Sequence, residues 1–137
     1  MNLPRYHRLR SAYYRLEGQR CPGCGDLHFP PRPSCTRCGH GELEPFRFCG
    51  RGEVFSFSVV AIAPRGFLAP YVVAMVELEE GVFVTAQLAD VELEDVAIGL
   101  PVEMVTRRLQ EAEPEGYIVY GYKFRPRLAA AVARLAP

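Results

Sequence analysis

The sequence predicts a mainly β protein with an N-terminal helix, a rubredoxin-like zinc ribbon, a five-stranded OB-fold barrel and a short C-terminal helix. Three observations lead to this prediction. A helical pattern opens the chain, two CxxC pairs follow it ten residues apart, and five short runs rich in apolar residues fill most of the remainder. We expect an amphipathic helix over residues 1–18, the ribbon over 19–49, the barrel over 50–125 and a helix or tail over 126–137.

The first segment has the period of an α-helix. Arginines such as Arg8 and Arg15 lie on one side, and aromatic and apolar residues share the other. This apolar face consists of Tyr6, Leu9, Tyr13 and Leu16. It needs a surface to cover, which is either the chain's own barrel or a partner protein. A partner is slightly favoured because a ribbon and a small barrel offer little flat area. We expect the helix to end near Gly18.

The two CxxC pairs carry the strongest chemical signal in the chain. They place the thiols of Cys21, Cys24, Cys35 and Cys38 in two tight turns, each followed directly by a glycine. Two such turns can direct four thiolates at one metal ion. The interval between the pairs is shorter than the roughly 15–20 residues usual in such ribbons, so the connecting hairpin must be short. Zinc is the favoured metal, with iron as its rival because four thiolates also suit iron.

A zinc ion held by four thiolates has no open position for water or substrate, so its role is expected to be structural. His28 and His40 are then packing or surface residues. A redox dithiol needs only one CxxC pair, and two disulfides suit a secreted chain, so both alternatives are weaker. Cys49 lies outside the pairs in an apolar stretch, and such a cysteine is more often a small core residue than a nucleophile.

The signals after Gly50-Arg51-Gly52 are those of β-structure. Runs of β-branched and aromatic residues alternate with turn residues, including Glu79-Glu80-Gly81 between the second and third runs. The expected strands are residues 54–62, 71–78, 82–88, 102–109 and 117–124. Five short strands with a long connection between the third and fourth fit a closed Greek-key barrel of the OB type, and a β-sandwich is the alternative. Pro126 then suits the first turn of a C-terminal helix.

The charge of the chain is balanced overall but unevenly distributed. The net charge is zero, yet residues 1–40 hold seven arginines against Glu17 and Asp26, and the remainder holds nine basic against fourteen acidic residues. An anionic ligand or an acidic partner could bind near the basic front, which could equally be a solvated surface. There is no signal-peptide pattern and no apolar run of membrane-spanning length. We therefore expect a cytoplasmic protein with reduced thiols and no membrane contact.

Several segments together resemble a known family. They are YRLEG at residues 14–18, FPPRP at 29–33, GRGEV at 50–54, PYVVA at 70–74 and YGYKFRP at 120–126. With the two CxxC pairs, these segments resemble the acyl-CoA-associated zinc-ribbon OB-fold family, long labelled a domain of unknown function. The resemblance covers about residues 6–126. It implies a non-catalytic accessory subunit that forms a hetero-oligomer with a thiolase-superfamily enzyme, namely an acetoacetyl-CoA thiolase, a hydroxymethylglutaryl-CoA synthase or both.

The resemblance also implies that the chain helps to hold or channel acyl-CoA, and the sequence offers candidate residues. CoA requires cations near its phosphates and an apolar channel for its pantetheine arm. Lys123, Arg125 and Tyr122 are candidates for this contact, although an edge strand with solvated charges explains the two cations equally well.

Two groups of residues are candidates for contact with a partner enzyme. Phe67 and Leu68 lie in a glycine- and proline-bounded loop that would present them to a partner or fold back onto the ribbon. Tyr6, Leu9 and Tyr13 of the helix form the second group. Both groups have apolar side chains that a partner surface could bury.

Two other classes of function rank lower. A single-stranded nucleic-acid binder is the alternative, because zinc ribbons and OB barrels recur in such proteins. However, the sequence has no lysine or arginine between Arg65 and Arg107, where the floor of the binding groove would lie. An independent enzyme would need a nucleophile beside a base, and three scattered histidines and one spare cysteine do not provide it. We therefore expect neither a nucleic-acid partner nor catalysis.

Overall fold

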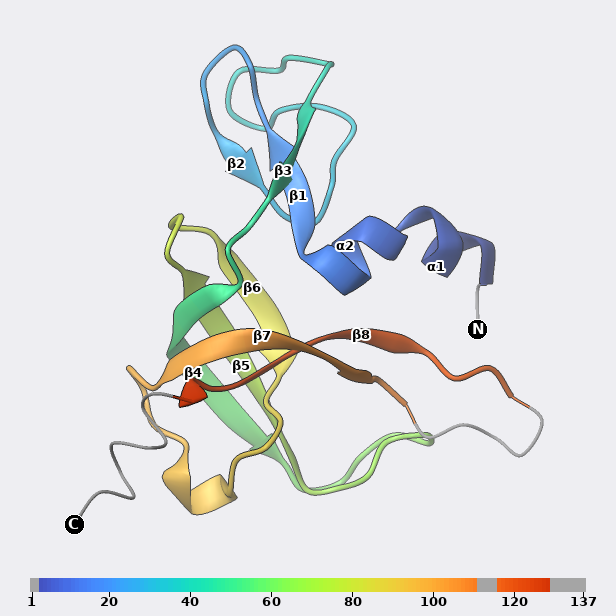
Figure 1. Ribbon diagram of the computed structural model, residues 1–137, viewed down its shortest axis with the longest axis vertical. Helices are drawn as coiled ribbons and strands as arrows, with labels where there is room; N and C mark the ends of the chain where they lie inside the picture. The colour runs from blue at the N-terminus through green and yellow to red at the C-terminus, as the bar shows by residue number, and fades with distance from the viewer. Residues whose placement is uncertain (1–2, 111–115, 129–137) are drawn as a thin grey trace.

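The structure is a computed structural model that describes residues 3–110 and 116–128. A small three-stranded sheet stands on one end of a five-stranded barrel, and two short helices run out from the junction between them (Figure 1). This is the mainly β architecture that the sequence predicts, with the helical segment first, the ribbon second and the barrel last.

The N-terminal segment forms two short helices, α1 (Leu3–Arg8) and α2 (Arg10–Arg15), in place of the single helix expected over residues 1–18. The second helix ends at Arg15 because Leu16 adopts a left-handed backbone conformation, with φ 50° and ψ 48°. The expected end near Gly18 is therefore wrong. Within the described residues, no helix is long and apolar enough to cross a membrane.

The ribbon is built on a three-stranded antiparallel sheet. β1 (Glu17–Arg20) is its central strand, and β2 (Leu27–His28) and β3 (Glu44–Arg47) pair with its two edges. Gly18 lies within β1, where a Cβ atom would collide with the backbone carbonyl of His28. Glycine occupies this position because the neighbouring strand is close, and a helix stop is not its role.

The barrel is a single sheet with the strand order β6-β5-β4-β7-β8. Its strands are β4 (Arg51–Val60), β5 (Tyr71–Leu78), β6 (Phe83–Gln87), β7 (Pro101–Arg108) and β8 (Tyr120–Pro126). A short 3₁₀ helix, η1 (Leu93–Asp95), lies in the long connection between β6 and β7. A parallel bridge between Leu88 and Phe124 joins the outer strands, and the N–H of Ala89 donates to the Phe124 carbonyl at 2.7 Å. This closure confirms the predicted OB-type barrel over the β-sandwich.

The last strand lies slightly later in the chain than predicted. β8 spans Tyr120–Pro126, whereas residues 117–124 were expected, and Pro126 pairs with Val102 of β7. Pro126 therefore ends a strand and does not begin a helix, so that part of the prediction is wrong. A strand end accommodates proline because the ladder can stop there. The rest of the expected C-terminal helix lies almost wholly outside the described residues.

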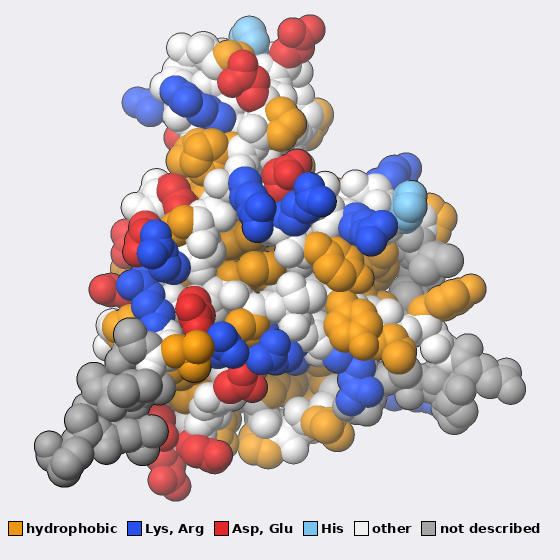
Figure 2. Space-filling model, viewed as in Figure 1, with side chains coloured by type: hydrophobic (Ala, Val, Ile, Leu, Met, Phe, Trp, Pro, Cys, Tyr) orange, Lys and Arg blue, Asp and Glu red, His pale blue; other side chains and the backbone are white. Residues whose placement is uncertain are grey.

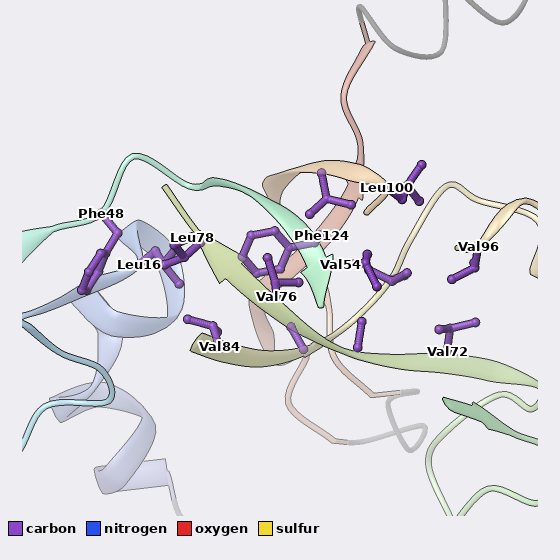
Figure 3. Packing of buried hydrophobic residues seen from close by; sticks show 14 residues of the cluster. Leu16, Phe48, Val54, Val72, Val76, Leu78, Val84, Val96, Leu100 and Phe124 are labelled. Atoms are coloured by element: carbon purple, nitrogen blue, oxygen red, sulfur yellow. The ribbon is translucent and has the colours of Figure 1, made fainter. Parts of the chain in front are cut away.

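The barrel core extends into the ribbon junction. Phe124 is fully buried at its centre and packs among apolar side chains from β4, β5, β6 and β7 (Figure 3). Leu16, which follows α2, and Phe48, which follows β3, belong to the same buried cluster. The helices and the ribbon are thus joined to the barrel by a shared core.

A row of aromatic rings crosses the same junction. Tyr13 of α2 stacks on Tyr122 of β8 with 6.2 Å between ring centroids, and Phe29 of the ribbon meets the edge of Tyr122 at 5.6 Å. The row continues from Phe29 to Phe48 at 6.1 Å. Aromatic contacts of this kind fix the helix, the ribbon and the barrel relative to one another.

Candidate functional site

The four cysteines of the CxxC pairs come together in the loops of the ribbon. Their Sγ atoms all lie within 4.8 Å of one another. The distances are 3.4 Å between Cys21 and Cys38 and 3.6 Å between Cys24 and Cys35. Four thiolates grouped this closely match the donor set of a structural zinc site, which leaves no position for substrate.

Two similar turns place these cysteines. In the first, the N–H of Cys21 donates to the Asp26 carbonyl at 2.8 Å, and the N–H of Gly25 donates to the Cys21 carbonyl at 2.9 Å. In the second turn, the N–H of Cys35 donates to the His40 carbonyl and the N–H of Gly39 donates to the Cys35 carbonyl, both at 2.9 Å. Gly25 has φ +76°, and the equivalent glycine of the second turn has φ +77°. The glycine after each pair is thus explained by a backbone conformation that other residues rarely adopt.

The thiols of the cluster have strongly divergent pKa values. The pKa of Cys35 is lowered to about 5, chiefly by a hydrogen bond from the backbone of Cys38 and further by His28. The backbone of Asp26 acts to lower the pKa of Cys24, but burial and the neighbouring thiols raise it to about 12. The four thiols therefore oppose one another's ionisation when no cation lies among them. A bound divalent metal ion supplies the charge that lets all four act as ligands.

The two histidines near the cysteines have different surroundings. His28 is buried, with only 5% of its surface exposed, and its Nε2 lies 3.3 Å from the Sγ of Cys35. His40 is exposed. Sequence reasoning missed the contact of His28, because the strand pairing that brings residue 28 beside residue 35 is not visible in the spacing of the cysteines.

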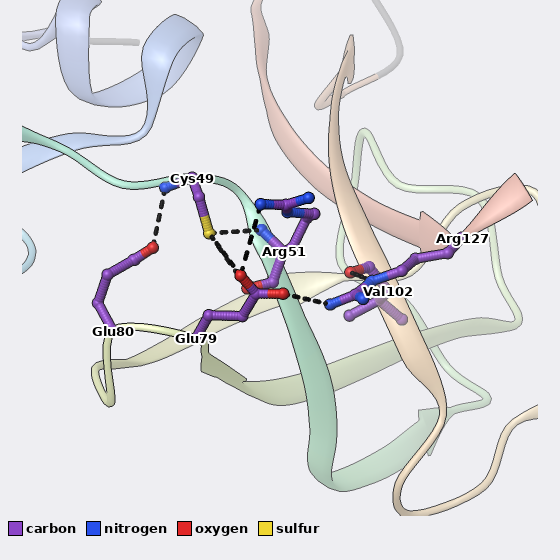
Figure 4. A network of polar contacts seen from close by, with 6 residues as sticks. All are labelled: Cys49, Arg51, Glu79, Glu80, Val102 and Arg127. Carbon is purple, nitrogen blue, oxygen red and sulfur yellow. Dashed lines mark hydrogen bonds and ion pairs between the residues drawn. The ribbon is translucent and has the colours of Figure 1, made fainter. Parts of the chain in front are cut away.

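Cys49 is exposed, so the expectation that it is a core residue is wrong. Phe48 before it is buried, and Cys49 faces the opposite way. Its N–H donates to Glu80 Oε1 at 3.0 Å, and its thiol lies 3.6 Å from a carboxylate oxygen of Glu79 (Figure 4). Partial shielding of the Cys49 thiol from water raises its pKa, and Glu80 raises it further. A thiol held in its neutral form beside carboxylates is a poor nucleophile.

The three residues expected to contact acyl-CoA do not share one surface. Tyr122 faces α2 and belongs to the aromatic row. Lys123 and Arg125 lie on the other side of β8, as alternation predicts. Arg125 pairs with Glu103 at 3.0 Å and lies 3.9 Å from Asp90. Burial lowers the pKa of Lys123, and nearby arginines lower it further, so this part of the barrel surface concentrates positive charge.

The residues expected to bind a partner fall in two separate places. Tyr13 packs on Tyr122 of the chain's own barrel, and Tyr6 lies 5.2 Å from Tyr13 between ring centroids. The loop between β4 and β5 lies at the other end of the barrel (Figure 1). In that loop Phe67 stacks on its neighbour Tyr71, whereas 73% of the surface of Leu68 is exposed. The helix face is thus partly occupied within the chain, and Leu68 is open.

An aromatic groove that the sequence did not predict lies between the helices and residues 117–120. We call it the tyrosine groove. It has a volume of about 520 Å³. Its walls include Tyr6, His7, Arg10, Tyr13, Tyr14, Tyr117, Ile118 and Tyr120. The fraction of the residue surface that is exposed to solvent is 67% for Tyr117, 54% for Ile118 and 43% for Tyr120. Sequence reasoning assigned residues 117–120 to a strand, which hid their position opposite the helices.

Positive charge accompanies this groove. The guanidinium group of Arg10 lies over the ring of Tyr14, 5.6 Å from its centroid. No aspartate or glutamate is among the described residues that line the groove. Apolar and aromatic side chains lie next to Lys and Arg side chains over the region of α1, α2 and β8 (Figure 2). Such a surface suits an apolar ligand or segment that also carries negative charge.

Comparison with known proteins now identifies the family. Residues 13–44 match the family model described as the ChsH2 rubredoxin-like zinc ribbon domain, and residues 47–107 match the ChsH2 C-terminal OB-fold domain. A DUF35 domain-containing scaffold protein of Pyrococcus furiosus is 48% identical over 128 residues, which are 92% of this chain and 93% of that protein. The chain belongs to the DUF35 family. The resemblance found in the sequence is thereby confirmed.

Two other similarities connect this DUF35 chain to enzymes. The benzoylsuccinyl-CoA thiolase subunit BbsA of Geobacter metallireducens is 42% identical over 73 residues, which are 53% of this chain and 49% of that subunit. A solved structure described as the Ltp2-ChsH2(DUF35) aldolase has a TM-score of 0.71 at 34% identity and covers 90% of this chain and 91% of its own. The match in structure confirms the predicted fold class of ribbon and OB-fold barrel.

Proposed function

We propose that this DUF35 protein is a non-catalytic accessory subunit of an acyl-CoA-metabolising enzyme complex. Its partner in this proposal is a thiolase-superfamily enzyme, namely an acetoacetyl-CoA thiolase, a hydroxymethylglutaryl-CoA synthase or both. Three similar proteins support the proposal: a DUF35 scaffold protein, a benzoylsuccinyl-CoA thiolase subunit and the Ltp2-ChsH2(DUF35) aldolase. The observation in this chain that carries it is the tyrosine groove, an exposed surface with the composition of a binding interface.

The chemistry of the described residues supports a non-catalytic role. The four clustered cysteines form a closed ligand set, which keeps substrate away from the metal. Cys49 has a raised pKa and lies beside two carboxylates, so it is not an activated nucleophile. His28, the buried histidine, contacts Cys35, which belongs to the closed set of metal ligands. The four cysteines and His28 thus stabilise the ribbon, and Cys49 lies on the surface.

The composition of the tyrosine groove supports a protein partner. Tyrosine and arginine are enriched among the residues that contribute most to protein–protein binding. Tyr14, Tyr117 and Tyr120 are exposed, and Arg10 is already held against Tyr14. The groove has room for apolar side chains of a partner, and the basic helices complement carboxylates around them. We infer that the partner inserts an apolar segment flanked by acidic residues.

Acyl-CoA contact is the finer part of the proposal. Lys123 lies near Arg107 and Arg108 of β7, where an added anion would relieve the repulsion between cations. A phosphate of CoA bound by a partner enzyme has the required charge. Arg125 is a weaker candidate because two carboxylates already engage it. Tyr122 packs against Tyr13 of α2, so it is a weaker candidate for ligand contact than Lys123.

Single-stranded nucleic acid is the second candidate ligand. The tyrosines of the groove and Arg10 could stack bases. The sequence has no lysine or arginine between Arg65 and Arg107, an interval that includes β5 and β6, and this opposes it because a strand of phosphates needs continuous positive charge. This ranking places a protein partner first.

Affinity capture tests the proposal directly. Tagged protein expressed in its native host would be captured from nuclease-treated lysate, and the bound proteins identified and quantified by mass spectrometry. We expect a thiolase-superfamily enzyme in near-stoichiometric amount. Failure to recover any CoA-dependent enzyme, together with retention of the protein on single-stranded DNA resin, would replace the proposal with the nucleic-acid alternative.

Variants then locate the binding surface on the captured complex. The double variant Tyr14→Ser and Tyr120→Ser should lower partner affinity at least tenfold, since truncation of a tyrosine at an interface hot spot costs about 2 kcal/mol or more. Phe83→Ser is the matched control, because Phe83 is similarly exposed on the barrel but lies outside the groove. Leu68→Ser tests the loop surface separately. Normal capture by the tyrosine variant and loss by Leu68→Ser would move the interface to the loop.

A further inference from the structure

We propose that His28 is a positioning residue of the metal site, in which its Nε2–H donates a hydrogen bond to the Cys35 thiolate. The bond would disperse negative charge and hold Cys35 in the geometry that binds the metal. Nothing in the spacing of the cysteines requires a histidine here. The inference concerns how tightly the ribbon holds its metal ion, and it is independent of which partner the protein binds.

The geometry supports a hydrogen bond to this one sulfur. Nε2 of His28 lies 3.3 Å from the Sγ of Cys35. The same nitrogen lies 3.7 Å from a carboxylate oxygen of Asp26, so the sulfur is the nearer acceptor. Asp26 lies beside the ring and favours the tautomer that carries its proton on Nε2. A thiolate has no proton to donate, so an Nε2–H group at this distance acts as the donor and the sulfur as the acceptor.

The backbone around His28 fixes the position of the ring. His28 is in β2 and pairs with Gln19 of β1. Its carbonyl is so close to Gly18 that no Cβ atom fits at residue 18. The side chain is 5% exposed, so it cannot turn out to solvent without opening the ribbon. A buried polar side chain held this firmly needs a partner, and Cys35 provides one.

Burial explains why Cys35 benefits from this donor. Cys35 is 3% exposed, whereas Cys24 and Cys38 are exposed to water. Four thiolates around a divalent ion leave a net negative charge, which water can solvate at the exposed sulfurs. Cys35 must receive hydrogen bonds from the protein, and the N–H of Arg37 at 3.4 Å is one such donor. His28 supplies a side-chain donor where water has no access.

The test compares three variants for zinc affinity, measured by competition with a chromophoric chelator at constant pH. His28→Leu fills the buried space but cannot donate, and we expect it to weaken zinc binding by about 10- to 100-fold, the range usual for such partners of metal ligands. His28→Gln keeps an N–H donor and should retain most of the affinity. His40→Leu is the matched control at an exposed histidine and should bind zinc normally. Unchanged affinity in His28→Leu would overturn the proposal.

Cobalt substitution separates a hydrogen-bonding role from a purely structural one. In the cobalt-loaded His28→Leu protein, we expect a four-thiolate spectrum whose sulfur-to-cobalt charge-transfer band is shifted to lower energy, because the sulfur has lost a donor. His28→Gln should restore the band toward the wild-type position. A wild-type spectrum typical of three sulfurs and one nitrogen would show that His28 is itself a ligand, and an unshifted band in a folded His28→Leu protein would leave it a packing residue. Either result contradicts the proposal.

A measurement on the unaltered protein covers the case in which His28→Leu fails to fold. In the cadmium-113-loaded wild-type protein, NMR should detect a scalar coupling between the Nε2–H proton of His28 and cadmium, transmitted through the Cys35 sulfur. Observation of that coupling establishes the bond. An Nε2 atom without a proton in the loaded protein would refute it.

Discussion

Five cysteines occupy two kinds of environment in this chain, and the difference decides their roles. Cys21 and its three companions lie in turns that bring their sulfurs within 4.8 Å of one another. Cys49 is exposed between β3 and β4, beside the glutamates of the turn after β5. The ligand set could be predicted from the sequence because CxxC spacing encodes a local turn. The exposure of Cys49 could not, because it depends on which way one side chain points after Phe48.

Substituting single cysteines should reproduce this division. Cys21→Ser removes a thiolate from a closed four-ligand site, so we expect loss of bound zinc together with loss of the folded ribbon. Cys49→Ser makes the same chemical change at an exposed position and should leave zinc content and the thermal midpoint unchanged. Metal analysis and circular dichroism on the two purified variants provide the comparison. A folded Cys21→Ser protein without metal would contradict a structural role for zinc.

Tyr122 links a single residue to the pH dependence of stability. Burial raises its pKa above the ordinary value, and Tyr13 raises it further. The folded state therefore favours the neutral phenol, and this stabilising contribution is complete below about pH 10 and is lost as the pH rises through the raised pKa. Between pH 8 and pH 11, wild-type protein should lose more unfolding free energy in urea than Tyr122→Phe. Equal losses in the two proteins would show that Tyr122 does not titrate in this way.

At the scale of elements, the sequence predicted the strands and the two CxxC turns better than it predicted where helices and strands end. The order of five strands followed from alternating residues and turn signals, which are local. The end of α2 could not be predicted in this way. It depends on Leu16, which has a left-handed backbone conformation and is buried in the same core as Phe124. Pro126 ends a strand because Val102 is available to pair with it, and that contact joins distant parts of the chain. The tyrosine groove was also missed because it is formed by the helices and residues 117–120, which are distant in the sequence.

The close packing of β4 on β5 yields a prediction at this scale. A Cβ atom at Gly52 would collide with the backbone carbonyl of Glu77, and backbone cannot yield as a flexible side chain does. Gly52→Ala should therefore lower the unfolding free energy by about 1–3 kcal/mol, the usual cost of overpacking. Gly41→Ala is the control because a Cβ atom there has nothing within 4 Å. Denaturant midpoints that match for the two variants would mean that the barrel tolerates separation of these strands.

At the scale of the whole molecule, the ribbon and the barrel form one cooperative unit in this account. Leu16 and Phe48, from the helix and ribbon segments, are buried in the same cluster as Phe124 of the barrel. Removal of zinc with a chelator should therefore broaden or shift the NMR signals of Phe124 and of the barrel valines as well as those of the ribbon. Barrel signals that stay unchanged in the metal-free protein would show that the two parts fold independently.

The sequence and the family together indicate the proposed role of the protein as an accessory subunit. The closed metal site, the neutral Cys49 thiol and the exposed tyrosine groove are the features expected of a subunit that organises other proteins. The partner enzyme lies outside this chain, so no pattern within it names that enzyme. The identity of the partner depends on the surface of that enzyme that binds this chain, and the capture experiment identifies the enzyme.

Under the proposed function, this protein assists acyl-CoA chemistry without performing it. The most direct test measures turnover of acetyl-CoA and acetoacetyl-CoA by the purified chain alone, by its captured partner enzyme alone, and by the two together. We expect no turnover by the chain alone and a change in the rate or stability of the partner enzyme when the chain is added. Turnover by the chain alone, abolished by a substitution within the chain, would contradict it.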